Sequence, residues 1–179
     1  IRYPHLFSTI DRKIYFKKFK SACERADKII AISQQTKQDI IDFLDIPESK
    51  ITVVYQGCNN IFQKPIAESK KEETLKKHNI PTEYLLNVGS IEERKNLLTL
   101  LQALKELPNQ KLVVIGNGKS YKIKCLRYIK EHNLSGRVMF LSNLTLEEMA
   151  VIYQSAQLMI YPSIFEGFGI PILESLFSK

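Results

Sequence analysis

Cysteine is scarce in this sequence, and the three that occur, Cys23, Cys58 and Cys125, are widely separated. They form no C-x-x-C pair and no His-Cys cluster, which disfavours a disulfide framework and a zinc site and makes a reducing, cytoplasmic environment the simpler expectation. No apolar run approaches the roughly 18 residues of a membrane span, and no signal peptide is recognisable. No acidic cluster suggests a metal site, so we expect no metal and no separate cofactor.

Patterns that define several other protein classes are also missing. A dinucleotide-dependent oxidoreductase would need G-x-G-x-x-G after its first strand and an acidic residue about 20 positions later, and neither occurs. Nucleic-acid binding is disfavoured because aromatic residues interleaved with a groove-binding motif are missing. The sequence has no internal repeat, low-complexity tract or heptad run. With 179 residues and 44% hydrophobic content, the chain can bury one core and an appended element.

Positive charge is concentrated at the start of the chain. The formal net charge is +7, and residues 1–28 carry eight Lys or Arg against three acidic side chains. A basic amphipathic helix is predicted at residues 10–26, and its apolar face comprises Ile10, Ile14, Phe19, Cys23 and Ala26. We favour a helix that packs within a domain and leaves its lysines solvated. The alternative is peripheral contact with anionic lipid headgroups at the inner face of a membrane.

A strand–helix–strand unit is predicted next. Residues 29–32 and 51–54 are expected to be short strands, and Ser33 is a good N-cap for a helix over 34–44. Gly, Asn and Pro gather after the second strand, which indicates an inter-domain hinge near residues 57–64, although an ordinary surface loop has the same composition. A solvated helix is expected at 66–79, and His78 at its end suits the negative end of the helix dipole.

Strand and helix patterns then alternate. Strands are expected at residues 84–88, 111–115, 137–141 and 158–161. One intervening helix should bury a face made of Leu97, Leu98, Leu101, Leu104 and Leu107. Another is expected at 119–133, and a third begins at a capping box formed by Thr145 and Glu148. This alternation predicts an α/β fold, a Rossmann-like parallel sheet with helices on both faces.

The most informative stretch follows the last strand. The apolar run 158–161, expected to be buried, leads through a Gly-containing loop to a helix that begins near Pro171. A strand, a glycine loop and a helix N-terminus together hold anions, because exposed amides and about half a positive charge of helix dipole converge there. The amides concerned belong to Phe168, Gly169 and Ile170.

Two carboxylates frame this loop. Glu166 opens it, and Glu174 follows after seven residues, where we expect the first turn of the helix. A second charged site lies after the first strand of the alternating region, which Gly89 ends. There Arg94 and Lys95 stand at the carboxyl end of a strand, the edge at which open α/β sheets bind ligands. Two adjacent cations can clamp a diphosphate.

The stretch Glu-Gly-Phe-Gly-Ile-Pro-Ile-Leu-Glu, residues 166–174, resembles the E-x7-E motif of retaining GT-B glycosyltransferases of family 4 (glycosyl transferases group 1). Arg94 and Lys95 are similar to the Arg-Lys pair of the same family, although Ser90 stands where many members have Arg. The segment Ala-Asp-Lys-Ile-Ile-Ala-Ile-Ser, residues 26–33, resembles the end of the family's N-terminal domain. The likeness thus extends over most of the chain.

The resemblance implies transfer of a sugar from a nucleotide-diphosphate donor, UDP- or GDP-linked, with retention at the anomeric carbon and without a metal ion. Glu166 would contact the donor sugar, Arg94 and Lys95 the diphosphate, and Glu174 the ribose. The loop from Gly167 to Ile170 would supply amides, and Gly89, Gly116, Gly118 and the segment Leu141–Leu144 would lie around the nucleotide. For Gly116 and Gly118, a purely structural turn is an equally good interpretation.

The resemblance also implies a division of the chain. Residues 1–62 would be the end of the N-terminal, acceptor-side domain with its hinge, and residues 63–179 a truncated donor-binding domain. We therefore expect a fragment of a longer bacterial enzyme of polysaccharide assembly, with a glycan or lipid-linked glycan as acceptor. The chain alone should bind a nucleoside diphosphate and turn over poorly or not at all. A non-catalytic nucleotide-sugar binding module is the alternative.

Overall fold

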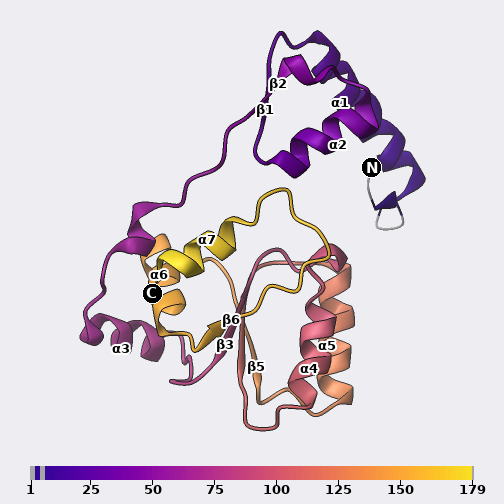
Figure 1. Cartoon of the computed structure of the whole chain (residues 1–179). Helices are drawn as coiled ribbons and strands as arrows, with labels where there is room; N and C mark the ends of the chain where they lie inside the picture. Colours follow the sequence, from indigo (N-terminus) through magenta and orange to yellow (C-terminus); the bar gives the residue numbers. More distant parts are fainter. Residues whose placement is uncertain (1–2, 5–6, 179) are drawn as a thin grey trace. The chain divides into compact units, whose positions relative to one another are not determined.

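The computed structural model describes residues 3, 4 and 7–178, and it divides into two compact units (Figure 1). The first contains the residues up to Gly57 together with Glu166–Phe168, and the second contains Cys58–Phe165 and the residues from Gly169 onward. The terminal residues Ile1 and Lys179, and Arg2 of the basic cluster, lie outside the described residues. The functional domain boundary at residue 62 stays a prediction.

The described residues of the first unit form two parallel strands and two α-helices. Its elements are α1 Thr9–Arg25, β1 Ile29–Ala31, α2 Gln34–Leu44, the 3₁₀-helix η2 Glu48–Lys50, and β2 Ile51–Val53. Strand β1 pairs in parallel with β2, and Ile29 is in register with Ile51. The predicted N-cap of α2 is confirmed, because the Ser33 hydroxyl accepts a hydrogen bond from the Thr36 amide at 3.0 Å. A small core forms from Ala31, Leu44, Ile46 and Ile51.

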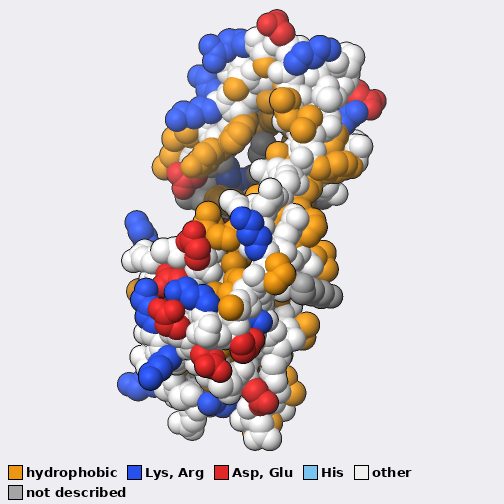
Figure 2. Space-filling view, turned by 90° about the vertical axis from the view of Figure 1, so that its left-hand side faces the viewer, with side chains coloured by type: hydrophobic (Ala, Val, Ile, Leu, Met, Phe, Trp, Pro, Cys, Tyr) orange, Lys and Arg blue, Asp and Glu red, His pale blue; other side chains and the backbone are white. Residues whose placement is uncertain are grey.

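Helix α1 does not bury the apolar face that the sequence predicted. Ile10, Ile14 and Phe19 are 72%, 47% and 56% exposed, and no α1 residue is buried among the described residues. Only Cys23, near the end of the helix, packs against the small core. The expectation that α1 packs along its whole apolar face is therefore wrong for the chain described. Figure 2 shows hydrophobic side chains lying at the surface among Lys and Arg. Membrane contact stays a prediction.

The second unit is a four-stranded parallel sheet with helices on both faces. Its strands are β3 Leu85–Val88, β4 Leu112–Ile115, β5 Val138–Leu141 and β6 Leu158–Met159. Its helices are η3 Asn60–Gln63, α3 Glu68–Lys77, η4 Glu93–Lys95, α4 Leu97–Lys105, α5 Ser120–Glu131, α6 Leu146–Ser155 and α7 Ile170–Phe177. The strand order is β5-β4-β3-β6. The predicted α/β architecture is confirmed.

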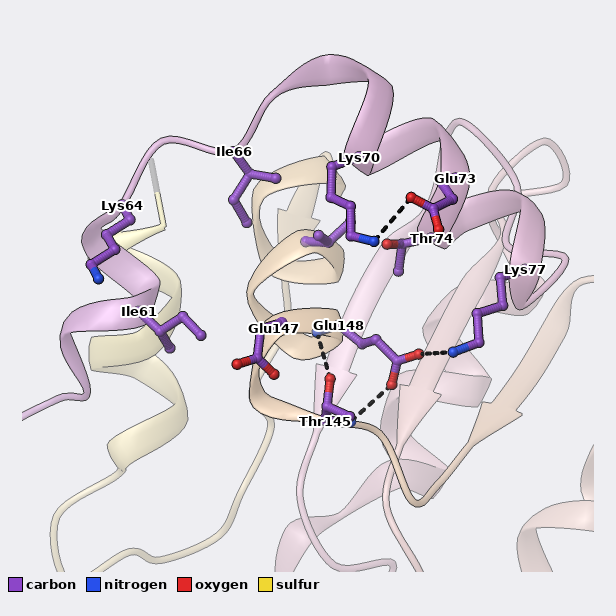
Figure 3. A pocket seen from close by; sticks show the side chains of 11 residues that line it. Ile61, Lys64, Ile66, Lys70, Glu73, Thr74, Lys77, Thr145, Glu147 and Glu148 are labelled. Atoms are coloured by element: carbon purple, nitrogen blue, oxygen red, sulfur yellow. Dashed lines mark hydrogen bonds and ion pairs between the residues drawn. The ribbon is translucent and has the colours of Figure 1, made fainter.

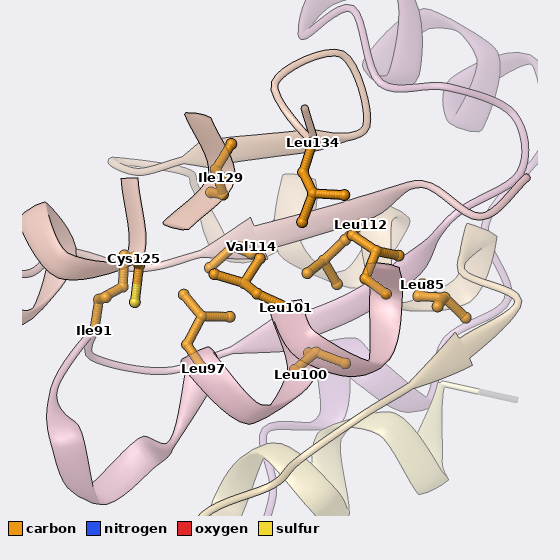
Figure 4. Packing of buried hydrophobic residues seen from close by; sticks show 11 residues of the cluster. Leu85, Ile91, Leu97, Leu100, Leu101, Leu112, Val114, Cys125, Ile129 and Leu134 are labelled. Atoms are coloured by element: carbon orange, nitrogen blue, oxygen red, sulfur yellow. The ribbon is translucent and has the colours of Figure 1, made fainter. Parts of the chain in front are cut away.

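The sheet separates two hydrophobic clusters because successive side chains of a strand point to opposite faces. Leu112 and Val114 of β4 face the cluster under α4 and α5, which Figure 4 shows. Val113 and Ile115 face the other cluster, which includes Phe62 and residues of α6. The helix face predicted for α4 is corrected at two positions: Leu100, which was not predicted, is buried, whereas Leu107 lies beyond the helix and is 47% exposed.

Strand β6 is shorter and more exposed than the sequence predicted. It spans two residues at the edge of the sheet and pairs only with β3 among the described strands. Leu158 is 58% exposed, so the expectation of a buried strand at 158–161 is wrong. The apolar run does not distinguish a central strand from an edge strand, because both are rich in the same residue types. The chain beyond β6 nevertheless continues along β3, since the Ile160 amide donates to the Leu86 carbonyl at 2.8 Å.

Candidate functional site

The two charged sequence motifs follow neighbouring strands of the second unit. The chain fills the sheet outward from β3 through β4 to β5 and then returns to place β6 on the other side of β3. The reversal of strand order between β3 and β6 is a topological switch point, and the crevice outside the carboxyl ends of two such strands is where open α/β sheets bind ligands. The loop with Arg94 and Lys95 follows β3, and the loop that begins at Tyr161 follows β6.

Direct hydrogen bonds join these two loops. The Arg94 guanidinium donates through Nη1 to the Phe165 carbonyl at 2.8 Å, and the Ile164 amide donates to the Arg94 carbonyl at 2.9 Å. The other guanidinium branch, Nη2, lies 2.7 Å from Glu92 Oε1. Arg94 therefore holds the loop after β6 with its main chain and its side chain, while an acidic neighbour orients the guanidinium.

Lys95 and Asn96 extend the connection. The Lys95 ammonium donates to the Tyr161 hydroxyl at 2.6 Å and lies 4.9 Å from the centre of the Tyr161 ring. The Asn96 amide donates to the Pro162 carbonyl at 3.3 Å. One step earlier, the buried Asn87 of β3 donates to the Ile160 carbonyl at 2.8 Å. The two cations predicted from sequence are thus placed at the switch point by partners that sequence reasoning did not identify.

Glycines allow the loops after β3 and β4 to approach each other. A Cβ atom on Gly116 would lie 1.9 Å from the Gly89 carbonyl oxygen, and one on Gly118 would lie 2.3 Å from the Ile91 carbonyl oxygen. Gly116 also has φ +153°, a conformation that L side chains rarely adopt. The close approach of the two loops explains why Gly116 and Gly118 are glycines. It directly supports the interpretation of these glycines as parts of a structural turn. Their contact with a nucleotide stays a prediction.

Helix α7 supplies the second carboxylate of the motif. The helix begins at Ile170 after Gly169, which has φ +92° and is buried. Glu174 is the fifth residue of α7, so the expectation that it lies in the first turn is wrong: the helix starts one residue before Pro171. The Tyr153 hydroxyl donates to Glu174 Oε2 at 2.7 Å. The pKa of Tyr153 is raised, first by burial and then by the Glu174 charge.

The other predicted site residues are distributed between the two units. Leu144 is half-buried and packs against the cluster under α6. Glu166, Gly167 and Phe168 are half-buried and belong to the first unit, whereas Gly169 and Ile170 belong to the second. Within the described part of the chain, no group of three or more His, Cys, Asp or Glu side chains is arranged to hold a metal ion.

A hollow of about 550 Å³ lies elsewhere on the second unit, between η3, α3 and α6 (Figure 3). On one side of it, Glu148 Oε1 lies 2.7 Å from both Lys77 Nζ and His78 Nε2, while Glu148 Oε2 accepts from the Thr145 amide. The capping box at Thr145 is confirmed, and His78 has a carboxylate partner beyond its predicted role at the helix end. None of the predicted site residues lines this hollow, so it gives the donor-site hypothesis no support.

Among the described residues, no helix combines the length and the apolar composition that a membrane span requires.

The second unit is a doubly wound α/β unit with two cations and a helix N-terminus on the loops that follow neighbouring strands. Cations beside a strand end and amides at a helix N-terminus are both groups that bind phosphates in proteins.

Family comparisons agree with this class of protein. Residues 70–178 match the family model described as Glycosyl transferases group 1, and residues 1–60 match the model described as Glycosyltransferase Family 4. The chain belongs to the glycosyl transferases group 1 family. Among curated relatives, the serotype-specific mannosyltransferase WbdA of Escherichia coli is 30% identical over 173 residues, which cover 92% of this chain and 21% of WbdA.

A second relative shows how much of a related protein this chain spans. The O-antigen chain mannosyltransferase RfbU of Salmonella typhimurium is 26% identical over 179 residues, covering 99% of this chain and 46% of RfbU. The chain thus spans less than half the length of these relatives. Among solved structures, Anabaena Alr3699/HepE in complex with UDP-glucose has a TM-score of 0.82 at 19% identity and covers 98% of this chain and 48% of its own. This likeness shows the GT-B fold.

Proposed function

We propose that the protein of which this chain is a part transfers a sugar from a UDP- or GDP-linked donor to a glycan or lipid-linked glycan, with retention at the anomeric carbon. The observation that carries the proposal is the hydrogen-bonded connection of the Arg94–Lys95 loop to the loop after β6 at the switch point. Relatives named as mannosyltransferases, and a structural neighbour solved with UDP-glucose, support a nucleotide-linked hexose as donor.

The charges of the second unit suit the departure of a nucleoside diphosphate. When the bond between the anomeric carbon and the phosphate oxygen breaks, negative charge develops on the diphosphate. Arg94 and Lys95 would stabilise that charge, together with the amides of Gly169 and Ile170 at the start of α7. The acceptor hydroxyl would attack from the face that the phosphate leaves, and the phosphate would take up its proton. No protein general base is assigned.

The two motif carboxylates would have separate roles. Glu174, held by Tyr153, would accept hydrogen bonds from the ribose hydroxyls, and Glu166 would contact the hydroxyls of the donor sugar. Because Arg94 and Lys95 would provide the positive charge that other transferases obtain from a divalent ion, we propose that donor binding is independent of magnesium. A cytoplasmic location belongs to the same proposal, and the inner face of a membrane is its alternative.

A transfer assay on the longer protein tests the proposal. The wild type should form product from one nucleotide sugar, the product should keep the anomeric configuration of the donor by NMR, and Glu166→Ala should abolish transfer. If the wild type binds the nucleotide sugar but makes no product with any glycan acceptor, the alternative of a non-catalytic binding module is correct. A product with inverted anomeric configuration would contradict the retaining mechanism but not the proposed sugar transfer. Measurable transfer by the 179 residues alone would contradict our expectation that this chain turns over poorly.

A further inference from the structure

The Glu174 carboxylate is held at one oxygen and accessible at the other. Oε2 accepts the hydrogen bond from the Tyr153 hydroxyl at 2.7 Å. No described residue donates a hydrogen bond to Oε1, and Oε1 is not among the fully buried side-chain atoms that lack a partner. One face of the carboxylate is thus fixed to α6 while the other can accept from a ligand.

Tyr153 itself has little freedom to move. It is 5% exposed, and its ring meets the ring of Phe62 edge-on, with centroids 5.4 Å apart and planes at 89°. Phe62, on η3, is 1% exposed. A tyrosine packed in this way presents its hydroxyl at a fixed point, because two side-chain torsions determine its position and both are restrained by packing. Burial and the Glu174 charge also raise its pKa, so the hydroxyl remains protonated and remains a donor.

We propose that Tyr153 is a positioning residue for ribose recognition: it orients Glu174 so that Oε1 accepts hydrogen bonds from the ribose hydroxyls of a nucleoside diphosphate. This inference rests on the proposed function and adds to it a residue outside the E-x7-E motif. Without the Tyr153 hydroxyl, the Glu174 side chain on a surface helix would sample several rotamers, and the ribose would have to order it on binding. Pre-arrangement removes that entropic cost.

The test compares ribose and dideoxyribose ligands by calorimetry. The 179-residue chain and its Tyr153→Phe variant are titrated with UDP and GDP and with their 2′,3′-dideoxy counterparts, which lack both ribose hydroxyls. Phenylalanine keeps the ring against Phe62 and removes only the hydroxyl. We expect the variant to bind the preferred ribonucleotide about tenfold more weakly, as loss of a hydrogen bond to a charged group predicts, and to bind the dideoxynucleotide as the wild type does.

Tyr84→Phe is the matched control. Tyr84 belongs to the same cluster, is fully buried, and donates its hydroxyl to the Ile152 carbonyl at 2.7 Å without touching Glu174. The Tyr84→Phe variant should have a lower melting temperature than the wild type and the same preference for ribonucleotides over dideoxynucleotides. In a Glu174→Gln background, Tyr153→Phe should cause little further loss of ribonucleotide affinity, because the two residues act on the same contact.

The outcomes distinguish a positioning role of Tyr153 from a structural role, and both from a failure of the proposed function. An equal loss of ribo- and dideoxynucleotide binding in Tyr153→Phe would make Tyr153 a merely structural residue and overturn the inference. Unchanged ribonucleotide affinity would overturn it as well. Failure of the wild type to bind any of the nucleotides would instead count against the proposed function itself, and the inference would fall with it.

Discussion

The side chain of Arg94 donates a hydrogen bond to the Phe165 carbonyl at 2.8 Å, across 71 positions of sequence. This bond joins the loop after β3 to the loop after β6, the two loops that flank the switch point of the sheet. A residue predicted from sequence to hold a diphosphate is therefore also part of the structure that shapes the site. A substitution at Arg94 should therefore change both the stability of the chain and its affinity for a nucleoside diphosphate.

Arg94→Lys keeps the charge and removes the forked geometry. We expect the free energy of unfolding to fall by about 1 kcal/mol, because lysine cannot reach the Phe165 carbonyl and Glu92 together. Nucleoside diphosphate affinity should fall about tenfold. Urea denaturation and calorimetry measure the two effects. Arg137→Lys is the control, since Arg137 Nη1 donates to the Leu107 carbonyl at 2.6 Å outside the candidate site; it should affect stability alone.

Gly116→Ala tests the close approach of the loops after β3 and β4. The added Cβ would lie 1.9 Å from the Gly89 carbonyl oxygen at φ +153°, so we expect a loss of at least about 3 kcal/mol in the free energy of unfolding. Gly136→Ala is the matched control, because its Cβ would meet nothing within 4 Å. Equal stability of the two variants in urea denaturation would show that the loops do not approach in this way.

The contacts of Glu148 predict a pH dependence of stability. Its pKa is lowered from 4.5 to about 2, first by the Lys77 hydrogen bond, then by the Thr145 amide and by His78. Because the folded-state pKa is depressed, the contribution of Glu148 to stability is fully present above pH 4.5 and is lost as the pH falls from 4.5 toward 2.

Glu148→Gln should remove that part of the pH dependence while keeping a residue that supports the capping box. Its unfolding free energy, measured by urea denaturation between pH 2 and 6, should vary less with pH than that of the wild type. Glu147→Gln alters the exposed neighbouring residue and should preserve the wild-type profile. Parallel profiles for wild type and Glu148→Gln would show that the Lys77 and His78 contacts do not contribute.

The sequence predicted elements better than it predicted contacts. Continuous apolar runs identified β3, β4 and β5, of which β3 and β4 are buried at every residue and β5 is half-buried. Helical periodicity identified α4, which buries one face. Sequence reasoning misjudged the burial of Leu158, because an apolar run does not reveal whether a strand lies at the edge of its sheet. It also included Leu107, since the spacing continues beyond the residue at which α4 ends.

The candidate site shows the same division. Arg94 and Lys95 were recognised from their position after a strand, but the Phe165 and Tyr161 atoms that hold them come from another loop. Tyr153 and Asn87 carried no sequence signal, because a tyrosine or an asparagine among apolar residues looks the same whether or not it touches a ligand-binding side chain. Only the packing of α6 against α7, and of β3 against β6, brings these partners together.

The most direct test of the central claim is a calorimetric titration of the 179-residue chain with UDP, GDP and ADP, with and without magnesium. We predict that UDP or GDP binds, that magnesium leaves the affinity unchanged, and that Lys95→Ala or Glu174→Ala removes the binding. Binding that survives both substitutions, or that requires magnesium, would contradict the proposed donor site at the switch point between β3 and β6.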